Sequence, residues 1–209
     1  MRIAVLGATG STGKKVIERG LALGHEMVAI ARRPEAITPA ARLRVFRADV
    51  LDGASLNVPV GGANAVISCI GPANNFSPGI VMSEGISNIV AACQQAGIRR
   101  FVMQSGITLS EGTELSVANR WAVRVLRRIF SKACNDKAIA ERIVQWSDLD
   151  WVIVRPAGLR EAAPRLKYTA GPNARIAPLL SLPFGDCADC LIRATIELTW
   201  IRKIINVGR

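Results

Sequence analysis

Short apolar segments alternate with longer amphipathic segments along most of this chain. The apolar segments are rich in β-branched residues, as is typical of buried strands in a parallel sheet. They cover 2–6, 27–31, 43–48, 65–70, 101–104, 151–155 and 204–207. Helical patterns fall between them at 10–23, 78–95, 115–146 and 187–198, with a break in the third near Asn135. The segment 158–183 is rich in Pro, Arg and Gly and is predicted to be mainly loop.

This alternation predicts an α/β fold: a Rossmann-type doubly wound parallel sheet with helices on both faces. No internal repeat or linker interrupts residues 1–209, so we expect a single domain. The late loop, about 156–184, is expected to complete its substrate side. Such sheets bind ligands outside the carboxyl ends of their strands, where the strand order switches. The residues that end the predicted strands are therefore candidates: Gly7, Arg32, Asp49, Gly71, Ser105 and Pro156.

The turn after the first apolar segment has three evenly spaced glycines, Gly7, Gly10 and Gly13. The first permits a tight turn, the second lets backbone N–H groups approach a pyrophosphate, and the third lets the helix pack closely on the sheet. The helix N-terminus adds unpaired N–H groups and partial positive charge. We expect a dinucleotide-phosphate site here, the alternative being an ordinary glycine-rich turn. Its predicted residues are Gly7, Thr9, Gly10, Ser11, Thr12 and Gly13.

The motif GATGSTG at positions 7–13 resembles the glycine motif of atypical and extended short-chain dehydrogenase/reductases. The nearest subgroup is the small NAD(P)H-binding proteins, which include NmrA-like regulators and flavin reductase/biliverdin reductase B. The resemblance covers nearly the whole chain and loosens after about Arg155. It implies that Asp49 and Val50 lie near the adenine. It also implies that the ribose and nicotinamide side is lined by Ser68, Cys69, Ile70 and Gly71, with Ser105 and Pro156 at neighbouring strand ends.

The end of the second apolar segment indicates which dinucleotide is preferred. NAD enzymes usually carry an acid there, which binds the ribose 2′-hydroxyl. This chain has Arg32 and Arg33 instead, and the first carboxylate is that of Glu35. Two guanidinium groups suit a 2′-phosphate, which they can bind bidentately. The sequence therefore predicts a preference for NADP(H) over NAD(H), the alternative being that one arginine caps a loop.

The superfamily's usual proton-donor pair, Tyr-x-x-x-Lys, is missing. The single tyrosine, Tyr168, lies in the late loop without a lysine four residues later, and the position four residues before Lys137 is Ala133. Ser105 matches the superfamily's serine after the fifth strand and is expected to bond the acceptor or the carboxamide, unless it only caps the strand. Lys137 is expected to bind the ribose or carboxamide, unless it is an ordinary surface residue. These two are the candidate catalytic residues.

Three functions remain open. The first is an NADPH-dependent reductase that transfers hydride to a flavin, quinone or other conjugated small molecule. The resemblance to flavin reductase/biliverdin reductase B implies this without a tyrosine acid, since there the protein mainly holds two rings face to face. The second is an NADP-binding sensor without turnover, as NmrA-like regulators are. The third is a non-redox isomerase or cyclase on the same fold.

The net charge of +11 is high for a metabolic enzyme. Part of it lies on a predicted amphipathic helix whose basic face is expected to be solvated, with nucleic acid, membrane or protein contacts as alternatives. Its cations are Arg120, Arg124, Arg127, Arg128 and Lys132, and its opposite side carries Trp121, Val125, Leu126, Ile129 and Phe130.

The remaining composition bears on compartment and metals. No apolar run is long enough to span a membrane, and five scattered cysteines suit a reducing cytoplasm. Cys187 and Cys190 form a C-x-x-C pair, but they fall in an apolar stripe and are expected to be buried, inert thiols rather than a redox pair. We predict no metal site.

Overall fold

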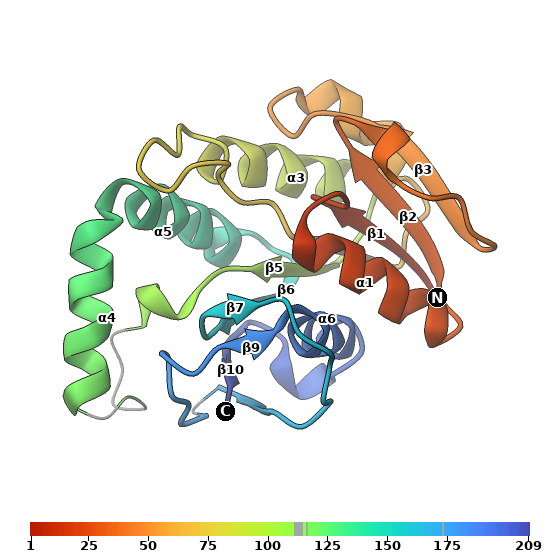
Figure 1. Cartoon of the computed structure of the whole chain (residues 1–209). Helices are drawn as coiled ribbons and strands as arrows, with labels where there is room; N and C mark the ends of the chain where they lie inside the picture. The colour runs from red at the N-terminus through yellow and green to blue at the C-terminus, as the bar shows by residue number, and fades with distance from the viewer. Residues whose placement is uncertain (111–114, 116, 173) are drawn as a thin grey trace.

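Eight strands form the central sheet in the order β3-β2-β1-β4-β5-β6-β10-β8. The computed structural model describes residues 1–110, 115, 117–172 and 174–209, and Figure 1 traces the chain through it. Seven strands are parallel, and β8 runs antiparallel at one edge. The strands are β1 (Arg2–Leu6), β2 (Glu26–Ala31), β3 (Leu43–Arg47), β4 (Ala65–Ser68), β5 (Arg100–Gln104), β6 (Asp150–Pro156), β8 (Thr169–Gly171) and β10 (Lys203–Gly208).

The strand order reverses at β1. This strand pairs with β2 on one side and with β4 on the other, so the chain winds outward in both directions from it. Ile3 and Leu6 are completely buried, as a strand covered on both faces requires. The predicted doubly wound, Rossmann-type fold is confirmed, and the ligand crevice of such a sheet opens beside β1.

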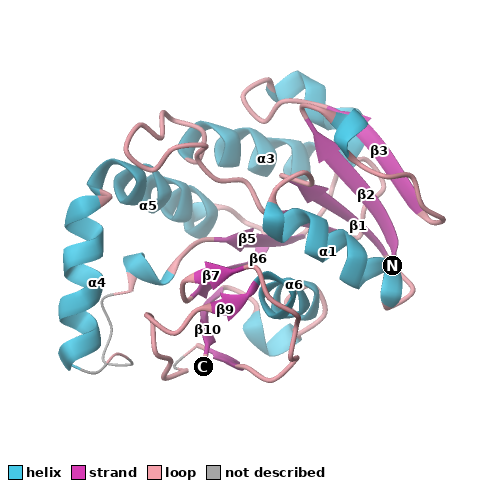
Figure 2. Ribbon diagram, in the orientation of Figure 1, coloured by secondary structure: helices cyan, strands magenta, loops and turns pink. Residues whose placement is uncertain are grey.

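Helices cover both faces of the sheet (Figure 2). On one face α1 (Ser11–Ala22) packs against α6 (Phe184–Arg193), and on the other α3 (Ser83–Gln95) packs against α5 (Ser131–Trp146). Two buried hydrophobic clusters fill the space between these helices and the sheet. The remaining elements are α2 (Asn57–Val60), α4 (Val117–Ile129) and a small second sheet of β7 (Leu159–Arg160) and β9 (Leu182–Pro183).

Several helix boundaries differ from those predicted. The helix predicted over 78–95 begins only at Ser83, because the buried carboxylate of Asp136 accepts hydrogen bonds from the backbone N–H groups of Met82 and Ser83 at 2.9 and 3.1 Å. The long helix predicted over 115–146 breaks at Phe130, whose ring packs on Phe76, and not near Asn135. Residues 116 and 173, inside predicted segments, lie outside the described residues.

The elements near the carboxyl terminus also differ from those predicted. The last helix was predicted over 187–198 but runs over Phe184–Arg193 and is followed by a short 3₁₀ turn. The predicted loop 158–183 contains three short strands, one of which, β8, joins the main sheet beside β10. These strands form through pairing with distant residues, so local composition does not reveal them.

The helix α4 keeps the predicted amphipathic pattern, and Arg124 and Arg128 on its basic side are exposed. The body of the protein covers only part of the apolar side. Val123 is buried, and Arg127 turns inward, where it donates to the carbonyl oxygens of Thr108 and Ser110 at 2.9 Å. Trp121 and Ile129 are exposed. The helix lies at the periphery of the molecule (Figure 1), and Val123 is the only buried residue among its described side chains.

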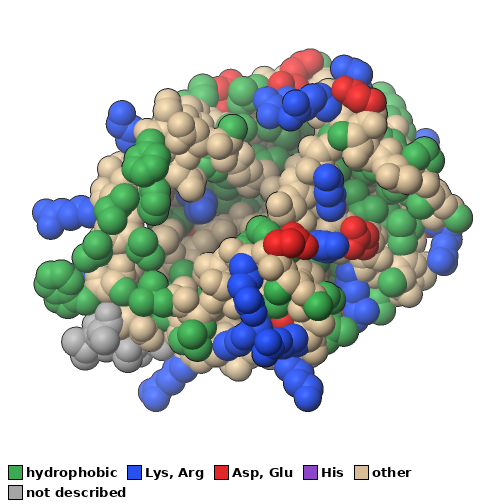
Figure 3. All heavy atoms as spheres, in the orientation of Figure 1, with side chains coloured by type: hydrophobic (Ala, Val, Ile, Leu, Met, Phe, Trp, Pro, Cys, Tyr) green, Lys and Arg blue, Asp and Glu red, His purple; other side chains and the backbone are tan. Residues whose placement is uncertain are grey.

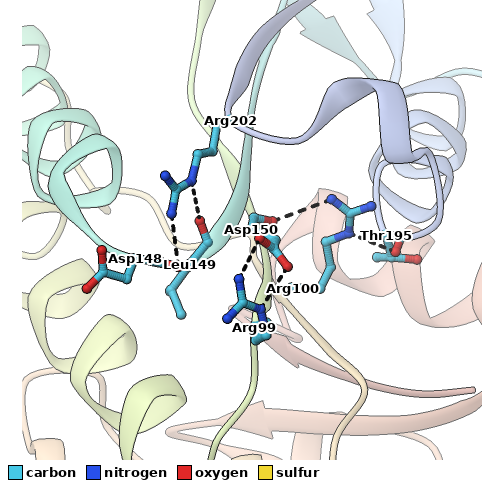
Figure 4. Close-up of polar contacts among 7 residues, drawn as sticks. All are labelled: Arg99, Arg100, Asp148, Leu149, Asp150, Thr195 and Arg202. Carbon is cyan, nitrogen blue, oxygen red and sulfur yellow. Dashed lines mark hydrogen bonds and ion pairs between the residues drawn. The ribbon is translucent and has the colours of Figure 1, made fainter.

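Arginines hold the amino-terminal edge of the sheet, opposite the predicted site (Figure 4). Arg100, at the start of β5, is buried and donates to the carbonyl oxygens of Thr195 and Glu197. Arg99 forms an ion pair with Asp150 at 3.1 Å. These guanidinium groups are engaged with the protein itself, so their role at this edge is structural. Among the described residues, no helix is long and apolar enough to cross a membrane.

Candidate functional site

One cavity at the carboxyl ends of the strands gathers most residues predicted to hold a dinucleotide. Figure 3 shows that this face of the molecule is hollowed at its centre. The lining includes Gly7, Thr9, Gly10, Arg32, Arg33, Asp49, Val50, Cys69, Ile70 and Gly71. These residues come from the ends of β1, β2, β3 and β4. The sheet topology thus brings together groups spread over the first third of the chain.

The glycine turn between β1 and α1 leaves no room for side chains at two positions. Gly7 has a φ of +76°, and a Cβ there would lie 2.7 Å from the carbonyl oxygen of Cys69. A Cβ on Gly13 would lie 2.2 Å from the carbonyl oxygen of Gly7. Both glycines are therefore required by the close approach of turn, helix and sheet.

Gly10 plays a different part in the same turn. It is the N-cap residue of α1, with an extended backbone that any residue can adopt, and it supplies no side-chain cap. The first N–H groups of α1, from Ser11, Thr12 and Gly13, therefore have no capping side chain at Gly10 and suit a bound anion. These three residues stand beside the cavity and are absent from its lining. The cradle fits a pyrophosphate.

The side chains of Arg32 and Arg33 are exposed at the mouth of the cavity. The described residues offer neither guanidinium a hydrogen bond or an ion pair. The nearest carboxylate in sequence, Glu35, instead pairs with Arg47 at 3.1 Å. Two cations without a partner among the described residues, at the mouth of this cavity, fit a phosphate group. The residues at the end of β2 include no acid that could bind a 2′-hydroxyl.

The floor of the cavity at Asp49 and Val50 is fixed by its neighbours. The backbone N–H of Leu51 donates to the Asp49 carboxylate at 3.1 Å, and the Asn88 amide of α3 donates to the carbonyl oxygen of Val50 at 2.9 Å. A Cβ on Gly85 of α3 would lie 2.9 Å from the Val50 side chain. Close packing of α3 thus holds this segment in place.

A second polar group lies at the ends of β5 and β6. The Ser105 hydroxyl is buried and donates to Glu141 Oε1 at 2.5 Å. Arg155 binds the same carboxylate through two nitrogens, at 3.0 Å to Oε1 and 2.5 Å to Oε2. The proton of Ser105 is therefore directed at Glu141, and only the lone pairs of its oxygen remain for a ligand.

Lys137 lies one helical turn before Glu141 on α5. Its Nζ is close to the backbone after β5, since a Cβ built on Gly106 would lie 3.3 Å from it. Burial lowers the pKa of Lys137 below the ordinary lysine value, and the interactions with Cys134 and Glu141 only partly offset this. The structure thus brings the two candidate catalytic residues to the same strand end.

Sequence reasoning missed Glu141 and Arg155. The spacing of Lys137 and Glu141, four residues apart on one helix, was the available signal, because such residues share a face. Arg155 stands immediately before a predicted strand-end residue, Pro156. The structure places Pro156 itself in the interior as the last residue of β6, paired with Val207 and outside the cavity lining.

Tyr168 and the C-x-x-C pair lie in the other hydrophobic layer. The Tyr168 hydroxyl donates to Asp189 on α6 at 2.6 Å, and Arg19 of α1 binds the same carboxylate. Burial and this hydrogen bond raise the pKa of Tyr168. Cys187 and Cys190 are fully buried as predicted, and burial raises both thiol pKa values. These groups stabilise α6 and do not reach the cavity.

Comparison with known proteins identifies the family and the fold. The model of the NAD(P)H-binding family matches residues 7–195. An uncharacterized chloroplast protein of Arabidopsis thaliana is 31% identical over 175 residues, covering 78% of this chain and 61% of that protein. The chain therefore spans about three fifths of that relative's length.

Two solved structures share the fold over the whole chain. A short-chain dehydrogenase/reductase of Veillonella parvula in complex with NADP has a TM-score of 0.81 at 21% identity, with 94% of that chain covered. ChuY, an anaerobillin reductase of Escherichia coli O157:H7, also has a TM-score of 0.81 at 21% identity, with 97% covered.

Proposed function

Because the chain belongs to the NAD(P)H-binding family, we propose that it is an NADPH-dependent reductase acting on a conjugated small molecule such as a flavin or a quinone. The observation that carries this proposal is the cavity lined by the glycine turn before α1 and by two arginines that have no partner among the described residues. The NADP complex of the Veillonella neighbour and the reductase activity named for ChuY agree with it.

The residues that would hold the cofactor have distinct tasks. The backbone at Gly10 and the first turn of α1 bind the pyrophosphate, and Arg32 and Arg33 bind the 2′-phosphate. The floor at Asp49 and Val50 supports the adenine end. When bound, NADPH supplies a hydride for the acceptor.

The group at the ends of β5 and β6 would act on the acceptor side. Reduction of a conjugated acceptor adds negative charge to it, and the Lys137 ammonium group is positioned to stabilise this charge in a partly dry site. Ser105 accepts a hydrogen bond from a ligand N–H, since its own proton is directed to Glu141. Arg155 holds the Glu141 carboxylate, and through it the Ser105 hydroxyl, in one orientation.

A tyrosine general acid has no part in this mechanism. Tyr168 is bonded to Asp189 between α6 and the late loop, so protonation comes from solvent or from Lys137. The test follows NADPH oxidation with riboflavin, FMN and quinones. Tyr168→Phe is expected to leave the rate within about threefold, whereas loss of a general acid costs about 10²–10⁴-fold.

Three outcomes would contradict the proposal in different ways. A collapse of turnover in a stably folded Tyr168→Phe variant would restore the tyrosine mechanism. Intact NADPH binding without turnover of any acceptor would favour a sensor protein. Isomerisation or cyclisation without net oxidation would favour a non-redox enzyme.

We further propose a cytoplasmic location, which agrees with five unpaired cysteines in the described part of the chain.

A further inference from the structure

The outer face of α4 is both apolar and basic. Trp121, Val125 and Ile129 follow one another at intervals of one helical turn and are 66%, 43% and 53% exposed. Arg124 and Arg128, which alternate with these residues in the sequence, are also exposed. Figure 3 shows apolar side chains gathered on the side of the molecule where α4 lies, with cationic side chains projecting from it. We call Trp121, Arg124, Val125, Arg128 and Ile129 the α4 outer face.

Packing against the described residues does not account for this face. The contacts that fasten α4 to the body come from its inner side, where Val123 is buried and Arg127 bonds two carbonyl oxygens. The apolar surface continues beyond the helix. The exposed ring of Phe76 packs on the ring of Phe130, the residue after Ile129, with 5.3 Å between the ring centroids. A contiguous apolar patch without a structural use indicates a binding surface.

The charges of α4 and of the first turn of α5 have one sign, although Glu111 and Glu114 precede this stretch and Asp136 follows it. From residue 115 to residue 135 the sequence holds no Asp or Glu. The cations of the same stretch are Arg120, Arg124, Arg127, Arg128 and Lys132. A partner that covers the α4 outer face must therefore carry negative charge as well as accept apolar side chains.

These two requirements separate the candidate partners. A second copy of this chain docked through the same face would bring the two arginines of each copy, Arg124 and Arg128, into one interface without an acid on that face to pair with them. A nucleic acid would pair with the cations but would leave Val125 and Ile129 in water. An anionic lipid surface meets both requirements. Its headgroups pair with the cations, and the apolar side chains Trp121, Val125 and Ile129 insert where headgroups meet acyl chains. We propose that the α4 outer face binds the surface of an anionic lipid bilayer, with α4 lying in the interface.

The test uses the full chain and two kinds of vesicle: phosphatidylcholine alone, and phosphatidylcholine with phosphatidylglycerol in equal parts. The protein is expected to sediment with the anionic vesicles and to be released by salt. Val125→Ser with Ile129→Ser is expected to weaken this association about tenfold or more, because two apolar side chains no longer leave water. Arg124→Glu with Arg128→Glu is expected to abolish it.

Matched controls separate this face from general surface properties. Leu198→Ser removes an apolar side chain that is more exposed, at 73%, and lies elsewhere on the surface. Arg44→Glu with Lys203→Glu changes the net charge by the same amount on exposed strand positions. Both controls should sediment like the unmodified protein. Unchanged NADPH binding and thermal midpoint in every variant exclude misfolding as the cause.

Tryptophan fluorescence reports the docking site directly. In a Trp146→Phe background the only exposed tryptophan is Trp121, because Trp151 and Trp200 are 7% and 5% exposed. Its emission should shift to shorter wavelength on anionic vesicles and stay unchanged on neutral ones.

Four results would overturn the proposal: no association with anionic vesicles at low salt, equal association with neutral ones, equal loss in the control variants, or no shift of Trp121 emission. A dimer that dissociates in the Val125→Ser, Ile129→Ser variant would assign the face to self-association. Binding of duplex DNA that survives this double substitution, without vesicle binding, would assign it to nucleic acid.

Discussion

Arg32 and Arg33 are the residues on which cofactor choice is proposed to depend. Both line the cavity and neither has a partner among the described residues. A hydrogen bond to a charged group contributes about 1.5–3 kcal/mol. Arg33→Ala is therefore expected to weaken NADPH binding by about 10- to 150-fold and to leave NADH binding nearly unchanged, as measured by titration calorimetry.

Arg44→Ala provides the control for this comparison. It removes the same charge from an exposed position on β3 outside the cavity lining, so neither affinity should change. Equal affinities of the unmodified protein for NADPH and NADH would refute the assigned preference.

We expect Lys137 to raise the catalytic rate and to lower the free energy of unfolding. Lys137→Met should lower kcat by about 10²–10³-fold, as loss of one charge-stabilising donor does. It should also raise the free energy of unfolding at pH 7. Because burial lowers the pKa of Lys137 in the folded chain, the unfolded chain binds this proton more tightly, and the folded state is penalised below the folded-state pKa.

The pH dependence of stability checks this reasoning. The penalty should fade as pH rises through the folded-state pKa and vanish above 10.5, the ordinary lysine value. Denaturant unfolding of both proteins over this range measures it. A variant that loses stability at pH 7 would mean that Lys137 serves packing and not the acceptor.

At the scale of elements, the turn between β1 and α1 separates a binding role from a packing role. Gly10→Val is expected to abolish NADPH binding in a folded protein. The extended backbone at this N-cap suits any residue, a Cβ there would lie 3.3 Å from the carbonyl oxygen of Gly7 and needs only a small shift, and the side chain would occupy the phosphate position. Gly13→Ala is expected to destabilise the fold by about 1–3 kcal/mol through overpacking against Gly7. Circular dichroism with cofactor titration distinguishes the two, and unchanged affinity in folded Gly10→Val would argue against the phosphate site.

At the scale of the whole molecule, cofactor binding is coupled to folding. A ligand at 100 times its Kd stabilises the folded state by about 2.7 kcal/mol. For a chain of this size that corresponds to a rise in Tm of about 5–11 °C. NADPH should produce this rise in a thermal scan, NADH at the same concentration a much smaller one. Equal shifts would show that the 2′-phosphate adds nothing.

The pattern of apolar, polar and glycine residues along the chain was sufficient to predict the fold class and the cofactor half of the candidate site. The β1 segment and the glycine turn are contiguous, and parallel topology alone predicts that Arg32, Asp49 and Gly71 meet the turn at one edge. These features depend on residues close in sequence and on a general rule of sheet winding, so they can be predicted from the sequence alone.

Long-range contacts decided the rest. The start of α3 depends on Asp136 from α5, and the orientation of Ser105 depends on Glu141 and Arg155, each more than ten residues away. The exposed side of α4 depends on which strip the body covers, which hydrophobic periodicity within the helix cannot reveal. Such features arise from side chains that meet only after the chain has folded, and they are absent from any local window of the sequence.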